Sequence, residues 1–287
     1  MLEKLIITVL AEDSVLYESP FLGQHGVCFF VEAYGKEKRN ILIDVGQNIQ
    51  AIAHNMELMG ISFKEIDAIV LTHCHYDHTQ GIVEVLELIG KKEVSVVAHP
   101  DIFRLNFITD PFIRHVGVMR EGIKEKIEEN GGRLFLTRDP LEIMPGVITT
   151  GEVERVTDFE EVGISLKTIT EDGRIVEDVM KDDISFVANI KGKGIVIISG
   201  CSHAGIVNIT KRAVKLTGED KILAIIGGLH LIDASSERIS KTVQALKEFD
   251  IELISAGHCT GFKAQVELYK AFGERFVPLH TGMKFEF

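Results

Sequence analysis

The chain has 287 residues, of which 45% are hydrophobic and 26% charged, so it can bury a sizeable core, and disordered and fibrous classes are excluded. Its 31 basic and 43 acidic side chains give a formal net charge of -12, which argues against nucleic acid and membrane surfaces as partners. Four cysteines are too few for a disulfide-stapled secreted domain of this length, and none forms a CxxC pair. We therefore expect reduced thiols and a cytoplasmic location.

The N-terminal apolar run at 5–10 is short and β-branched, and Glu12 and Asp13 follow it closely. It predicts a buried strand and not a signal peptide. No later stretch approaches the roughly 20 apolar residues that span a bilayer. We expect a protein without a membrane segment.

Strands and helices are predicted to alternate along the chain. The β-branched runs that predict strands lie at 4–10, 27–33, 40–45, 67–72, 94–98, 184–190, 194–199, 222–226 and 251–255. Helical spacing occurs at 49–59, 81–89, 207–216, 236–249 and 261–272, the fourth opened by a capping serine at 235. This alternation predicts an α/β fold, and the absence of a linker or repeat predicts one domain over 1–287.

The stretch at about 104–183 is less regular than the rest. It contains a charged helical segment at 120–130 and a hairpin candidate around 171–174. We interpret it as an insertion that decorates the core and contributes substrate contacts.

One segment concentrates side chains that bind metals. Residues 69–81, IVLTHCHYDHTQG, place His73, His75, Asp77 and His78 within six positions after a β-branched run. If the strand stays extended through His75, its period of two puts His73 and His75 on the same side, and the other two follow on the turn into a helix. Imidazoles with a carboxylate suit zinc, iron or manganese, and two such sets side by side can hold two ions.

Further ligands are expected where other predicted strands end in a glycine turn and a histidine. The strand at 194–199 leads to His203, and the strand at 251–255 leads to His258. The strand at 222–226 leads to His230, which we keep as an alternative ligand or a neighbour of one. Strand ends of α/β folds converge on a crevice, so these segments can complete one site.

Together these motifs resemble the metallo-β-lactamase superfamily. The resemblance rests on HxHxDH at 73–78, ILIDVG at 41–46 and the strand ends at 200–205 and 257–261. It covers nearly the whole chain and implies a four-layer αβ/βα sandwich. The segments TTGE at 149–152, SGCSHAG at 199–205, GGLHL at 227–231 and GHCTG at 257–261 further resemble the branch named for a dihydropterin–ribofuranosylaminobenzene phosphate synthase.

The resemblance implies two divalent ions, with zinc expected and iron or manganese as alternatives. The implied ligands form two sets, His73, His75 and His203 for the first ion and Asp77, His78 and His258 for the second. Asp44 would orient a ligand or the motif loop. Where most members have a Gly-Asp pair with a bridging aspartate, this chain has Gly200-Cys201. We expect Cys201 to pack and His203 to reach the metal, while contact by Cys201, or by both, stays an alternative.

Residues outside the motifs have weaker signals. His25 lies in the segment GQHG at 23–26 and is expected to enter the cleft and contact substrate. Cys74 and Cys259 flank motif histidines and are expected to pack, because neighbours in an extended chain point to opposite sides. The basic run at 211–215 is either a solvated face or a contact for a small anionic substrate near His203.

The leading functional hypothesis is a metal-dependent hydrolase in which a metal-activated water, held and oriented by Asp77, attacks an ester, amide or phosphoester. The branch resemblance implies an alternative, a transferase that joins a dihydropterin methyl diphosphate to an aminobenzene riboside phosphate while the metals assist departure of diphosphate. A non-catalytic metal-binding protein is a further alternative. The diiron oxidoreductases of the superfamily would need a carboxylate at His75, which counts against redox chemistry.

Overall fold

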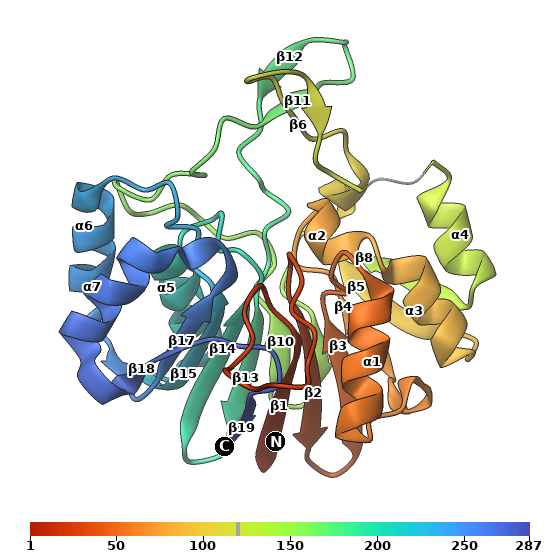
Figure 1. The fold of residues 1–287 in the computed structure, drawn as a ribbon, viewed down its shortest axis with the longest axis horizontal. Helices are drawn as coiled ribbons and strands as arrows, with labels where there is room; N and C mark the ends of the chain where they lie inside the picture. The colour runs from red at the N-terminus through yellow and green to blue at the C-terminus, as the bar shows by residue number, and fades with distance from the viewer. Residues whose placement is uncertain (119–120) are drawn as a thin grey trace.

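The computed structural model describes residues 1–118 and 121–287. Two large β-sheets face one another, and helices cover their outer faces (Figure 1). A small antiparallel sheet, which we call the lobe, projects from one end of the molecule (Figure 1). The predicted α/β class and four-layer sandwich are confirmed.

The first large sheet has the strand order β19-β1-β2-β3-β4-β5-β8. Its strands are β1 Lys4–Ala11, β2 Cys28–Tyr34, β3 Lys38–Ile43, β4 Ala68–Val70, β5 Val94–Ala98, β8 Gly132–Leu136 and β19 Lys284–Glu286. β3, β4, β5 and β8 pair in parallel, whereas β1 pairs antiparallel with β2 and β19. The carboxyl ends of β3, β4 and β5 therefore lie at one edge of the sheet.

The second large sheet has the order β18-β17-β15-β14-β13-β10-β9, and β16 pairs with β15. Its strands are β9 Glu142–Met144, β10 Val147–Thr149, β13 Phe186–Ile190, β14 Gly194–Ser199, β15 Lys221–Gly228, β16 Asp250–Ile251, β17 Ile254–Gly257 and β18 Phe276–Pro278. β14, β15 and β17 are parallel, so the loops that follow them also share one edge.

Helices pack on the outer face of each sheet. The first sheet carries α1 Ile49–Met59, α3 Ile82–Ile89 and α4 Ile123–Glu129, and the second carries α5 Ile206–Thr217, α6 Ser236–Leu246 and α7 Phe262–Phe272. α6 begins at the predicted cap, because Ser235 Oγ accepts a hydrogen bond from Arg238 N.

Alternating side chains along the strands build three apolar layers. In β14, Val196 and Ile198 enter the core between the sheets, whereas Ile195 and Ile197 face the helices of the second sheet. All four are fully buried. A strand with two buried faces reads as a continuous apolar run, which is why 194–199 was predictable to the residue.

The irregular stretch at 104–183 is not uniform. β8, β9 and β10 fall within it yet belong to the large sheets. The lobe has the order β12-β11-β6-β7, with β6 Phe107–Ile108, β7 Arg114–His115, β11 Lys167–Ile169 and β12 Ile175–Glu177. The predicted hairpin at 171–174 joins β11 and β12 and is confirmed. α4 lies inside the predicted helical segment, whose first residue, Arg120, lies outside the described residues.

Within residues 1–118 and 121–287, no helix has both the length and the hydropathy needed to cross a bilayer.

Candidate metal centre

The HxHxDH segment leaves β4 earlier than predicted. β4 ends at Val70, and the backbone N–H of Thr72 donates to the Asp44 carboxylate and not to a strand. The chain then turns into the short helix α2 Tyr76–Thr79, which carries Asp77 and His78. His73 Nε2 lies 3.1 Å from His75 Nδ1, so the two rings face the same side, as the sequence predicted.

Loops from the second sheet complete the cluster. His203 follows β14, and its Nε2 lies 3.2 Å from His75 Nδ1. His258 follows β17, and its Nε2 lies 3.3 Å from Asp77 Oδ2. The structure brings together the two predicted sets, because within each set the donor atoms lie within 4.8 Å of one another: His73, His75 and His203, and Asp77, His78 and His258.

The first set fits a divalent cation. Burial lowers the pKa of His73, His75 and His203, that of His75 to about 3, so these imidazoles stay neutral and keep a lone pair. His75 Nδ1 lies 3.1 Å from His73 Nε2 and 3.2 Å from His203 Nε2, so three ring nitrogens converge on one point. Three neutral imidazoles are a donor set that zinc accepts readily.

The second set stabilises positive charge. Burial disfavours a charged imidazole, but Asp77 and Asp44 outweigh it and raise the pKa of His78 to about 9. His78 in turn holds the pKa of Asp77 well below its usual range, against the opposing effect of burial. Burial also opposes charge on His258, but Cys259, Asp13 and Asp77 raise its pKa, so in the protein alone both rings favour a bound proton. A divalent cation held by Asp77, His78 and His258 can take the place of those protons.

Asp44 supports the motif from behind. It follows β3, is fully buried and adopts a left-handed φ of 55°. Its carboxylate accepts from Thr72 N, from Thr72 Oγ1 and from His78 Nδ1, each at 2.7 Å. A strained residue with three such contacts fixes both the motif loop and the orientation of the His78 ring.

Cys201 faces the donors. Its Sγ lies 3.2 Å from His78 Nε2 and groups with His73 and His78 within the same 4.8 Å limit. The expectation that Cys201 only packs stays a prediction, and this geometry supports the alternative of metal contact. His203 also points into the cluster, so the structure accommodates both.

The other two cysteines differ from each other. Cys74 is buried in the core between the first sheet and its helices, as predicted. Cys259 instead groups with Cys201 and His258. The alternation argument fails there because the chain after β17 turns into a 3-10 helix at His258–Thr260 and is not extended.

His25 Nε2 lies 3.5 Å from Asp77 Oδ2 with half of its side chain exposed, consistent with the expected place at the cleft.

Sequence reasoning missed two acidic residues. Asp13 lies between His25 and His258 and contacts both rings, while Glu12 accepts from the His258 backbone. The signal was the acidic pair directly after the first strand, which served only to argue against a signal peptide.

His230 lies beside the first set. Its ring centroid is 4.1 Å from that of His203, and its buried Nδ1 has no hydrogen-bond partner among the described residues. It is not a member of the donor groups found in the described residues. It therefore occupies the place of a neighbour of a ligand, the second of the two predicted alternatives.

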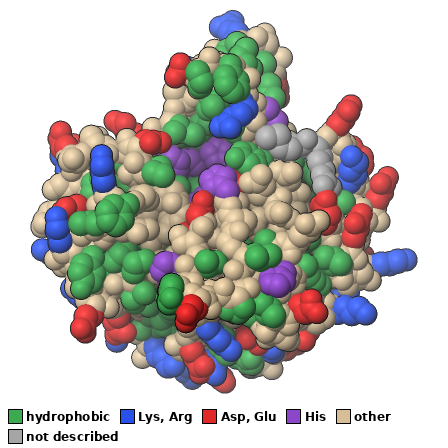
Figure 2. All heavy atoms as spheres, viewed as in Figure 1, with side chains coloured by type: hydrophobic (Ala, Val, Ile, Leu, Met, Phe, Trp, Pro, Cys, Tyr) green, Lys and Arg blue, Asp and Glu red, His purple; other side chains and the backbone are tan. Residues whose placement is uncertain are grey.

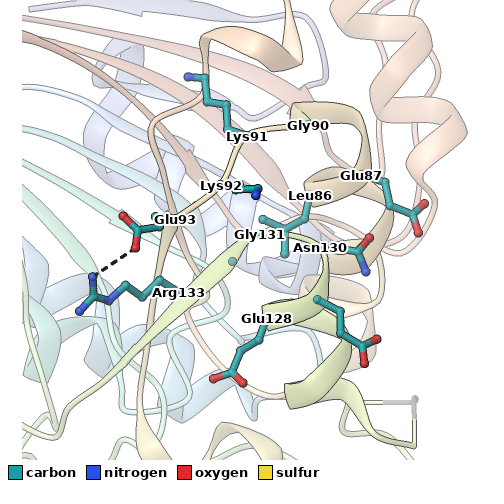
Figure 3. Close-up of a pocket in the computed structure, with 12 residues that line it drawn as sticks. Leu86, Glu87, Gly90, Lys91, Lys92, Glu93, Glu128, Asn130, Gly131 and Arg133 are labelled. Carbon is teal, nitrogen blue, oxygen red and sulfur yellow. Dashed lines mark ion pairs between the residues drawn. The ribbon is translucent and has the colours of Figure 1, made fainter.

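Histidine side chains reach the surface as a group below the lobe (Figure 2). A hollow of about 690 Å³ lies elsewhere, at the amino ends of β5 and β8. Lys91, Lys92, Glu93 and Arg133 line it, with Arg133 paired to Glu93 (Figure 3). Because the motif loops leave the carboxyl ends of the strands, this hollow is on the wrong edge for the metal chemistry.

The predicted basic run lines a separate hollow of about 160 Å³ on α5, together with Glu154 and Asn208. Closer to the cluster, Arg155 donates from Nη1 to the carbonyl oxygen of His203 at 2.7 Å. Arg155 thus supports the His203 loop, and the sequence did not single it out.

Comparison with known proteins agrees with this architecture. A family model described as the metallo-beta-lactamase superfamily matches residues 23–258. The chain belongs to the metallo-β-lactamase superfamily.

Among relatives, the chain is 42% identical to the 7,8-dihydropterin-6-methyl-4-(beta-D-ribofuranosyl)-aminobenzene-5'-phosphate synthase of Methanocaldococcus jannaschii, covering 98% of this chain and 96% of that protein. Because the family is enzymatic and this relative is a named synthase, the chain is an enzyme.

Solved structures share the fold along the whole chain. Tm1679, titled a metal-dependent hydrolase of the β-lactamase superfamily, superposes with a TM-score of 0.80 at 25% identity, covering 98% of both chains. YhfI of Bacillus subtilis, titled a metallo-β-lactamase fold protein, has a TM-score of 0.59 at 13% identity, covering 99% of this chain and 100% of that one.

Proposed function

We propose that this enzyme is a transferase that joins a dihydropterin methyl group to an aminobenzene carrying a ribofuranosyl phosphate. The proposal takes the substrate class from the relative's name and chooses the alternative over the leading sequence hypothesis of hydrolysis. The observation that carries it is the pair of adjacent donor sets in a chain that matches the synthase from end to end. Both substrates would be small and anionic.

The reaction exchanges one bond for another. The dihydropterin enters as its methyl diphosphate, and the methylene carbon forms a bond to the aminobenzene nitrogen as its bond to the diphosphate oxygen breaks. Diphosphate leaves with the electron pair, and the nitrogen loses a proton. Two bound divalent ions would act as Lewis acids that balance the charge of the leaving diphosphate.

The chain's own residues hold and orient these components. His73, His75 and His203 would bind the first ion, and Asp77, His78 and His258 the second, with zinc proposed and iron or manganese as alternatives. Buried Asp77 and half-exposed His25, in contact at 3.5 Å, form the pair that can take up the proton. Asp44 keeps the His78 ring in place.

Hydrolysis is the second candidate, and one observation favours it. The structure with a TM-score of 0.80 is titled a metal-dependent hydrolase. In that reaction Asp77 would hold and orient the attacking water on an ester, amide or phosphoester.

One incubation separates the two reactions. The zinc-loaded enzyme is supplied with dihydropterin methyl diphosphate, with and without the aminobenzene riboside phosphate, and products are followed by mass spectrometry. A transferase yields the coupled product and diphosphate only when both substrates are present. Release of diphosphate and hydroxymethyl-dihydropterin at an equal rate without the amine would contradict the proposal and favour hydrolysis.

A further inference from the structure

The loop that follows β1 holds His258 from two sides. β1 ends at Ala11 and delivers Glu12 and Asp13 in succession. Glu12 Oε1 accepts a hydrogen bond from the backbone N–H of His258, and Asp13 Oδ2 lies 2.5 Å from His258 Nδ1. Two consecutive carboxylates thus fix the backbone and the ring of one residue.

The surroundings of this contact are specific. Glu12 is buried, its backbone N donates to Thr281 Oγ1 at 2.8 Å, and its Oε2 accepts from Ser14 N at 2.5 Å. Gly257 leaves room for it, because a Cβ at that position would collide with Glu12 Oε1. His258 itself has a φ of 50°, which an ordinary residue keeps only where neighbours enforce it.

The ring is thereby aimed at the second donor set. With Nδ1 on Asp13, His258 presents Nε2 to Asp77 Oδ2 at 3.3 Å. The other oxygen of Asp13 lies 3.0 Å from His25 Nδ1, so one carboxylate spans a candidate ligand and a residue at the mouth.

Among the residues that the structure describes, carboxylates support only the second set in this way. His78 has Asp44 behind it and His258 has Asp13. In the first set, His203 Nδ1 contacts the carbonyl oxygen of Val162, a neutral group. An acceptor behind a metal-binding histidine fixes its tautomer and orientation, and losing it typically costs 10- to 100-fold in metal affinity.

We propose that Asp13 is a positioning residue for the second donor set, which sets the ring of His258 and through it the binding of one of the two divalent ions. The inference rests on the proposed metal centre. Its test measures metal binding and not turnover, so a failure of the transferase assay leaves it standing, and the reverse also holds.

The experiment is a titration of the metal-free protein with Co²⁺ against a chromogenic chelator. In Asp13→Ala, one bound equivalent should weaken by about 10- to 100-fold while the other keeps its wild-type affinity. Asp13→Asn keeps the size of the side chain and one acceptor oxygen, so the affinity of its weakened equivalent should lie between those of the wild type and Asp13→Ala. Asp13 is partly exposed, and the midpoint of thermal unfolding of each metal-free variant shows whether the fold is retained.

Glu152 offers a matched control. Its Oε1 lies 2.9 Å from Nε2 of buried His99, a carboxylate–imidazole contact outside both donor sets. Glu152→Ala should leave both cobalt equivalents unchanged. Three results overturn the proposal: unchanged affinities in Asp13→Ala, equal weakening of both equivalents, or the same selective loss in Glu152→Ala.

Discussion

Replacing Asp44 by asparagine should lower both the stability of the fold and the affinity for metal, and the two losses can be measured separately. Oδ1 accepts from Thr72 N, while Oδ2 accepts from both Thr72 Oγ1 and His78 Nδ1, all at 2.7 Å in a fully buried setting. Asparagine can keep the Oδ1 contact, but its amide group would then face two donors. The contact with Thr72 Oγ1 is then lost, and losing a buried hydrogen bond to a charged group costs about 1.5–3 kcal/mol, so urea unfolding of the metal-free variant should show a loss of about 1.5–3 kcal/mol.

The effect on metal binding has a different cause. The new N–H would donate to His78 Nδ1 and leave the ring proton on Nε2, the atom that faces Asp77 and Cys201. One cobalt equivalent should weaken by about 10- to 100-fold in chelator competition. Asp67→Asn is the control. Asp67 lies away from the site, and its Oδ2 accepts a hydrogen bond from Asn40 N, with 2.9 Å between the two atoms. Unchanged cobalt affinity in Asp44→Asn would refute the tautomer argument.

Four further outcomes are expected. By elemental analysis and the coupling assay, His75→Ala should lose bound metal and turnover. His54 is exposed on α1 and its Nε2 lies 3.3 Å from the carbonyl oxygen of Pro20, so His54→Ala should lose neither; equal metal content would contradict the ligand assignment. Asp77→Asn should lower turnover by about 10²–10⁴, because the amide cannot accept a proton. It should retain most of the first ion, which His73, His75 and His203 would hold; near-wild-type turnover would contradict the role of Asp77 as proton acceptor. The cobalt enzyme should show a sulfur-to-metal charge-transfer band that Cys201→Ser removes; a spectrum unchanged by the substitution would show that the thiol only packs. In urea unfolding, metal-free protein should lose stability as pH falls from 7 toward 3, because burial lowers the pKa of His75 to about 3 in the folded state only. Burial raises the pKa of Asp183 to about 7, and this shift favours the folded state in acid. Asp183→Asn should therefore steepen the loss of stability.

Elements with two buried faces were the easiest to predict. β5 and β14 match their predicted bounds. α1 has only one buried face, but it also matches, because the left-handed Gly60 marks its end. Strands of three residues at sheet edges were missed. An example is β19, in which Lys284 and Glu286, the first and last residues, are exposed. Such strands owe their conformation to a neighbouring strand, and the neighbour lies far away in sequence.

The site divides in the same way. His73 and His75 lie on one side, as their spacing of two predicted, although β4 ends at Val70 and does not run extended through them. Asp13 gave no such signal, since it meets His258 across 245 positions and the contact exists only once the sheets are packed. The place of Cys259 beside Cys201 and His258 was not predicted, because a period of two was applied where the chain had already turned.

The two donor sets also bear on how metal and fold depend on each other. Each set combines side chains from loops of the first sheet with a histidine from the second, so an ion would tie the two sheets together at one edge. The sheets nevertheless share an apolar core that includes the fully buried Phe29 and Phe186, each contributing about 1.5–3 kcal/mol. The fold therefore has a source of stability that needs no metal, unlike a zinc finger, which unfolds without its ion. Metal at a hundred times its dissociation constant would add about 2.7 kcal/mol, and that gain should appear first in the histidine loops, where the ring nitrogens of His73, His75 and His203 crowd together.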